Sequence, residues 1–186
     1  MILPIYAYGQ PVLRKMGADI NPDYPDLQQL IANMWETMYN AHGVGLAAPQ
    51  IGLAIRLFLV DTVQMMDKGK EDEGIKQAFI NAHVVETGGD PWPYEEGCLS
   101  IPEVRADVER AAQVKLRYQD ENFTPHEKIF TGFNARVILH EYDHIDGVLF
   151  TEHLSPLKKR LIKRRLENIR KGKISSNYKM KFPRIK

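Results

Sequence analysis

The sequence predicts an α+β domain in which central antiparallel or mixed strands surround a helix that carries an H-E-x-x-H motif. Strand-like segments gather in the middle of the chain and helical segments lie near both ends, which is typical of this class. The length of 186 residues suits one ordinary domain with a single core. With 44% hydrophobic and 26% charged residues, the composition excludes a disordered, collagen-like or membrane-embedded chain.

An N-terminal helix is the first element that the pattern predicts. Apolar side chains recur at helical spacing over residues 26–40, directly after Pro25. Residues 43–49 then break this spacing. Four strands are expected next, at residues 56–60, 78–85, 113–118 and 128–131. A charged loop at 64–75 follows the first strand, and a turn at 88–91 follows the second.

Two further helices are predicted towards the C-terminus. The first covers 133–145 and stops before Gly147, a residue that suits a helix end. The second begins at Ser155 as N-cap, has Pro156 at its first position and reaches about residue 171. We therefore expect one domain over 1–172 and a basic tail over 173–186.

Charge is distributed unevenly, although the formal net charge is only +1. From Lys158 onward there are thirteen Lys and Arg residues against one acidic residue, so this segment carries +12 and the rest of the chain −11. Such a segment predicts an anionic partner. The helix within it has an apolar side that we expect to pack on the body: Leu157, Leu161, Ile162, Leu166 and Ile169.

Two features predict a cytoplasmic protein without a membrane partner. A single cysteine cannot form an internal disulfide, so nothing calls for an oxidising compartment. The first residues lack the basic and apolar regions of a secretory signal, and the longest apolar runs are far shorter than a membrane span.

The H-E-x-x-H motif, residues 140–144, predicts a metal site. On a helix, His140 and His144 share one face and can bind one ion, and Glu141 lies about 100° around the axis, where it can reach a water at the metal. The alternative is a pair of half-buried histidines on an amphipathic helix. We favour a metal because buried histidines need a partner.

A third ligand is expected, and Cys98 is the candidate. In the metallopeptidase continuation of the motif a third histidine is needed where this chain has Phe150. Cys98 stands in Glu-Gly-Cys-Leu-Ser, residues 96–100, and alone it could equally be a small inert core residue. A Cys/His/His set suits Fe²⁺, Zn²⁺, Co²⁺ or Ni²⁺. A metallopeptidase and a non-catalytic RNA-binding protein remain as rival interpretations.

Together with Gly-Val-Gly-Leu-Ala-Ala-Pro-Gln, residues 43–50, these segments resemble the three signature motifs of the peptide deformylase family. Pro-Val-Leu-Arg, residues 11–14, resembles the N-terminal segment of the family. One departure is Leu139, where members commonly carry Gln. The resemblance implies hydrolysis of the N-formyl group from the formyl-methionine of nascent polypeptides, with release of formate.

The resemblance also implies roles for individual residues. Cys98, His140 and His144 would bind the metal, with Fe²⁺ expected, and Glu141 would carry the proton. The Gln50 side-chain amide and the Leu99 N–H would meet the developing oxyanion. The residues expected to bind substrate are Gly43, Val44, Gly45, Gly97 and Val137, of which Val137 is explained equally well by core packing.

Partners follow from the same resemblance. The substrate is a nascent polypeptide, so we expect residues 158–186 to bind the ribosome surface, which is mostly RNA phosphate, and we expect no DNA partner. Removal of the chain after Lys171 should then leave hydrolysis of a free peptide nearly unchanged. Arg105 fits two roles, a contact to the peptide or an ion pair with the acidic body.

Overall fold

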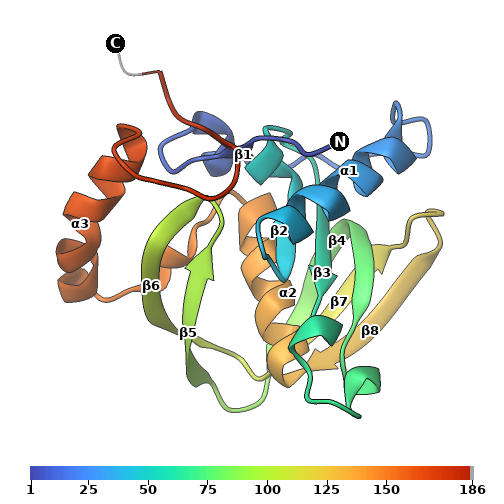
Figure 1. The fold of residues 1–186 in the computed structure, drawn as a ribbon. Coiled ribbons are helices and arrows are strands. Elements are labelled where there is room, and N and C mark those ends of the chain that lie inside the picture. The colour runs from blue at the N-terminus through green and yellow to red at the C-terminus, as the bar shows by residue number, and fades with distance from the viewer. Residues whose placement is uncertain (185–186) are drawn as a thin grey trace.

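The fold is α+β, as the sequence predicts, in a computed structural model that describes residues 1–184 (Figure 1). A five-stranded antiparallel sheet has the order β2-β3-β4-β7-β8. Its strands are β2 (Gly45–Ala47), β3 (Leu57–Asp61), β4 (Lys76–Gly88), β7 (Gln113–Gln119) and β8 (Pro125–Thr131). A separate antiparallel hairpin consists of β5 (Trp92–Cys98) and β6 (Ile101–Arg110), and a parallel pair of β1 (Ile5–Tyr6) and β9 (Met180–Lys181).

Three α-helices accompany the strands in the described part of the chain: α1 (Leu27–Asn40), α2 (Gly132–Ile145) and α3 (Pro156–Arg170). The short 3-10 helices are Pro11–Arg14, Ala48–Ile51, Val63–Met65, Glu71–Glu73 and Phe150–His153. The predicted ends of the helices are confirmed in detail. Ser155 Oγ accepts a hydrogen bond from Lys158 N, and Gly147 follows α2 with a φ of 76°.

Helix α2 lies between the five-stranded sheet and the β5–β6 hairpin (Figure 1). On the sheet side it contacts β2 and β3, and Ala135, Ile138 and Ile145 are fully buried against the sheet. The rings of Phe58 and Phe79 stack in the same cluster with centroids 4.8 Å apart. Burial of these side chains fixes the rotation of α2, so the face with the H-E-x-x-H residues is directed at the end of the hairpin.

The hairpin and the short strands were missing from the sequence prediction. The turn predicted at 88–91 joins β4 to β5 rather than two of the predicted strands. In β5, Pro93 and a run of exposed residues hide the alternation that marks a strand, and the register with β6 shifts between Gly97 and Cys98. Strand β2 is only three residues long and entirely buried, so it has no alternation at all.

The apolar side of α3 was only partly predicted. Leu166 and Ile169 are buried as expected, and α3 packs on β6. Leu157 and Leu161 are 66% and 73% exposed, so the expectation that they pack on the body is wrong. They lie about 140° or more around the helix axis from Leu166, so they are on the side of α3 that faces solvent.

Residues 173–184 run back from α3 across the body, and Met180 and Lys181 pair with Ile5 and Tyr6 (Figure 1). Whether residue 172 divides a catalytic domain from a tail stays a prediction. No helix among residues 1–184 is both long and apolar enough to cross a bilayer.

Candidate metal centre

Three potential metal ligands converge where the end of β5 meets α2. The ligand atoms of Cys98, His140 and His144 all lie within 4.8 Å of one another, and Cys98 Sγ is 3.2 Å from His144 Nε2. The two histidines are one helical turn apart, which places them on one face of α2. A bulge between Gly97 and Cys98 ends the regular hairpin pairing and directs the thiol to this face.

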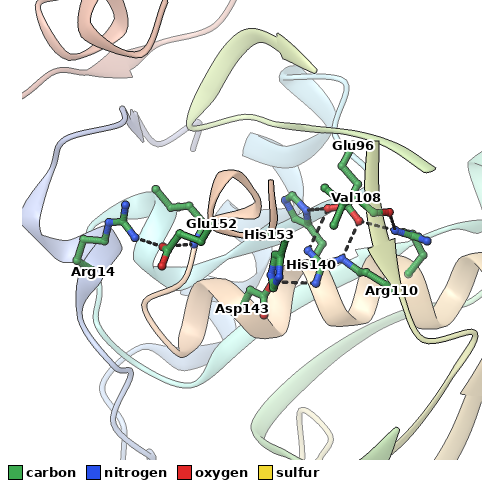
Figure 2. A network of polar contacts seen from close by, with 10 residues as sticks. Arg14, Glu96, Val108, Arg110, His140, Asp143, Glu152 and His153 are labelled. Carbon is green, nitrogen blue, oxygen red and sulfur yellow. Dashed lines mark hydrogen bonds and ion pairs between the residues drawn. The ribbon is translucent and has the colours of Figure 1, made fainter. Parts of the chain in front are cut away.

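The orientation of His140 is fixed by Glu96. His140 Nδ1 lies 2.8 Å from Glu96 Oε2, which leaves Nε2 for the centre (Figure 2). A carboxylate on the second nitrogen of a metal-binding histidine fixes both its tautomer and its ring orientation. Glu96 also accepts hydrogen bonds from Arg110 Nε at 2.7 Å and Arg136 Nη1 at 2.9 Å. Burial opposes its ionisation, but the bonds from His140 and Arg110 outweigh it and hold the pKa of Glu96 far below the usual value.

Asp143 belongs to the same network and not to the metal ligands. Its Oδ2 is 2.8 Å from Arg110 Nη1 and 2.7 Å from His153 Nε2 (Figure 2). Arg14 and Glu152 form a further pair nearby. Sequence reasoning gave no role to Glu96, Arg110 and Arg136. Glu96 is the first residue of a signature motif, but the two arginines come from β6 and α2, and no local pattern connects them.

The donor set fits a divalent metal ion. Burial raises the pKa of the Cys98 thiol, but the charge of His144 and hydrogen bonds with both histidines outweigh it and lower that pKa to about 5. The thiolate is therefore the main form at neutral pH. One thiolate and two imidazoles at this spacing are a common set for Fe²⁺, Zn²⁺, Co²⁺ or Ni²⁺.

Glu141 lies beside the three ligands, and their charges act on its carboxyl group. It is 4% exposed, and its Oε2 has no hydrogen-bond partner among the described residues. Burial raises the pKa of Glu141 to about 7. The carboxylate rests against the backbone of β2, since a Cβ placed on Gly45 would lie 2.4 Å from Oε1. A buried carboxylate with a free oxygen is able to hold and release a proton.

Gln50 presents its amide nitrogen to the centre. It lies on the 3-10 helix after β2, and its Oε1 accepts a hydrogen bond from Ala47 N at 2.9 Å. Nε2 is thereby directed towards Cys98 Sγ and Ser100 Oγ, at 3.5 and 3.3 Å. The side chain is 1% exposed, so its orientation is fixed by packing as well.

A cavity of about 470 Å³ opens in front of these groups. All five residues predicted to bind substrate line this cavity: Gly43, Val44, Gly45, Gly97 and Val137. The cavity is also lined by Gln50, Cys98, Leu99, His140 and Glu141. Tyr178 also lines the cavity, and no sequence pattern indicated it. Arg105 Nη1 is 3.7 Å from Glu95 Oε2 at the exposed rim. Leu139, on α2, is partly buried and packs against the core cluster that includes Phe58 and Phe79.

Comparison with known proteins decides the family. A family model described as polypeptide deformylase matches residues 2–160. The chain belongs to the peptide deformylase family. A peptide deformylase of Christiangramia forsetii is 54% identical over 193 residues, covering 100% of this chain and 98% of that protein. This deformylase is therefore a metal-dependent hydrolase that removes the N-formyl group from nascent peptides, as the sequence motifs predict.

Solved peptide deformylases share the fold. One from Plasmodium falciparum is 29% identical with a TM-score of 0.81, covering 90% of this deformylase and 95% of that chain. One from Acinetobacter baumannii, solved with Met-Ala-Ser bound, is 32% identical with a TM-score of 0.74, covering 83% and 99%. Family membership decides against both rivals, the metallopeptidase and the non-catalytic RNA-binding protein.

Proposed function

We propose that Glu141 carries the proton in deformylation and that Cys98, His140 and His144 hold the metal. The observation that supports this most is the buried Glu141 carboxylate, whose free oxygen lies beside three convergent ligands in the wall of the cavity. When bound, the metal lowers the pKa of water and polarises the formyl carbonyl. Glu141 takes a proton from the attacking water and returns it to the departing amine.

The oxyanion is met by two donors of the chain, the Gln50 amide and the Leu99 N–H. Support comes from the fixed direction of Gln50, whose Oε1 is already engaged by Ala47 N. Only its NH₂ group is left to face the reacting carbonyl. Donors that are oriented before the reaction begins are worth more than donors that must turn, and losing one typically costs about 100-fold or more in kcat.

The peptide binds in extended form between two free strand edges. Among residues 1–184, strand β2 ends the five-stranded sheet and pairs with β3 alone, and β5 pairs with β6 alone, while residues of both line the cavity. An extended peptide can add to such edges through backbone hydrogen bonds. Gly43, Val44, Gly45 and Gly97 lie along these edges, and Val137 contributes to the pocket for the methionine side chain. Met-Ala-Ser bound to the Acinetobacter baumannii relative supports a peptide that begins with Met.

Iron is the metal that we propose, as Fe²⁺, with Zn²⁺, Ni²⁺ or Co²⁺ as substitutes. A thiolate with two imidazoles is soft enough for each of these ions, so the ligands alone do not select one. Anaerobic purification followed by metal analysis tests the assignment. A preparation that holds zinc and no iron, purified without oxygen, would contradict it.

The substitution Glu141→Gln tests the function. Because Glu141 is not a ligand in this proposal, the variant should keep its metal and lose nearly all turnover. Formate release from a formyl-Met-Ala-Ser peptide and metal content are measured on the same preparation. A variant with more than a tenth of the wild-type kcat would contradict the role, and acetyl-Met-Ala-Ser serves as the substrate control.

We also propose a cytoplasmic enzyme that binds the ribosome through its basic C-terminal helix and the residues after it. Lys159, Arg160, Lys163 and Arg164 are exposed on α3, and exposed Leu157 and Leu161 lie among them. Binding of RNA phosphate should weaken steeply between about 50 and 200 mM salt. Lys159→Glu together with Lys163→Glu should reduce co-sedimentation with ribosomes and leave peptide hydrolysis unchanged; unreduced co-sedimentation would contradict the proposal.

A further inference from the structure

The segment after α3 is fastened to the body next to the metal centre. Gly172, with a φ of 65°, reverses the chain at the end of α3, and β9 then pairs with β1. Ile5 N donates to Lys179 O at 2.9 Å and Ala7 N donates to Lys181 O at 3.0 Å. Residues 173–184 are therefore a fixed part of the fold and not a loose extension.

This segment brings Tyr178 to the cavity. The Tyr178 hydroxyl donates a hydrogen bond to Leu99 O at 2.7 Å, and the half-buried ring lines the cavity and packs against the core cluster that includes Ile5. A hydrogen bond of this length between half-buried partners is well formed. It connects the C-terminal segment directly to the residue after Cys98.

The residues around Leu99 are held from three sides. Tyr178 engages Leu99 O, the backbone N–H of Tyr8 donates to Ser100 O at 2.8 Å, and Gln50 Nε2 lies 3.3 Å from Ser100 Oγ. Tyr8 follows β1, which itself pairs with β9. The end of the hairpin is thus fixed by the same pair of strands that carries Tyr178.

We propose that Tyr178 is a positioning residue for deformylation. By holding Leu99 O, it fixes the rotation of residue 99 and keeps the Leu99 N–H directed into the cavity. This inference rests on the proposed role of that N–H as an oxyanion donor. Because the N–H acts on charge that develops in the transition state, loss of the Tyr178 hydroxyl should lower kcat and leave KM unchanged. A chain that ends after Lys171 would lose this contact, so it should also lose turnover, contrary to the expectation from sequence alone.

The variant Tyr178→Phe removes the hydroxyl and keeps the ring. We expect kcat on a formyl-Met peptide to fall about five- to tenfold, as loss of one neutral hydrogen bond predicts, with KM within twofold and metal content unchanged. Tyr6→Phe is the matched control. It removes a hydroxyl that accepts from Lys181 Nζ at 2.9 Å, in the same strand pair but away from Leu99, and kcat should stay near wild type.

Three outcomes would overturn the inference. Unchanged kcat in Tyr178→Phe would show that the hydroxyl is dispensable. A rise in KM with unchanged kcat would assign Tyr178 to substrate binding, and an equal fall in both variants would assign it to strand pairing. The Glu141→Gln variant is measured in the same assay. If it is active, the proposed function fails; if it is inactive while Tyr178→Phe keeps its kcat, only the positioning role fails.

Discussion

The substitution Gly45→Ala places one methyl group against the carboxylate that we propose as proton carrier. The added Cβ would lie 2.4 Å from Glu141 Oε1 and 2.7 Å from its Cδ, whereas an ordinary contact begins near 3.4 Å. The Glu141 carboxylate must therefore retreat by about 1 Å. Gly45 lies in β2 without a positive φ, so alanine adds no backbone strain there.

The cost should fall on turnover and less on stability. A displacement of about 1 Å in a reacting group can reduce the rate about 100-fold, and we expect a loss of this size in kcat. Overpacking of this kind usually lowers the free energy of unfolding by only about 1–3 kcal/mol, since the end of a side chain moves and not the backbone.

Formate release measured with metal content and urea unfolding checks this prediction. Gly88→Ala is the matched control, because its Cβ would meet only Gln113 Nε2, at 3.9 Å, and kcat should not change. A folded, metal-loaded Gly45→Ala enzyme with wild-type kcat would show that Glu141 has more freedom than the packing against β2 allows, and would refute the reasoning.

Further predictions concern the ligands and the network behind them. Cys98→Ser should reduce metal content sharply, because a mostly protonated hydroxyl replaces a thiolate; equal metal in both proteins would contradict this. Glu96→Gln should lower the free energy of unfolding by about 3 kcal/mol, since Arg110 and Arg136 stay buried beside a neutral group; a loss below about 1 kcal/mol would count against it. Because folding lowers the pKa of Glu96, its stabilisation is full above the ordinary carboxyl pKa and is lost as pH falls towards the lowered value, which urea unfolding across acid pH would show.

The metal ligands could be predicted because each depends on a local signal. A spacing of four on a predicted helix fixes His140 and His144 on one face, and the helix ends at Ser155 and Gly147 follow from capping chemistry. The central strands β3, β4 and β7 were found from apolar runs. Cys98 was found by elimination and by the resemblance of its motif.

The parts that sequence did not predict depend on contacts between distant segments. Pro93 and Gly97 weaken the strand pattern of β5, which gains its partner only by pairing with β6. Tyr178 belongs to no motif, and the role that we propose for it depends on a hydrogen bond to Leu99, a residue 79 positions away in the sequence. Leu157 and Leu161 share one face of α3, but that face is about 140° or more around the axis from Leu166, and it is exposed because the body covers only the other side.

The pairing of β1 with β9 has a consequence for how the enzyme is made. Tyr6 and Lys181 are 175 residues apart, so β1 is synthesised long before its partner strand exists. Closing so long a loop is a late event in folding, and here it waits for nearly the whole chain to leave the ribosome. Until then Tyr178 cannot reach Leu99, and an unfinished copy lacks part of its active site.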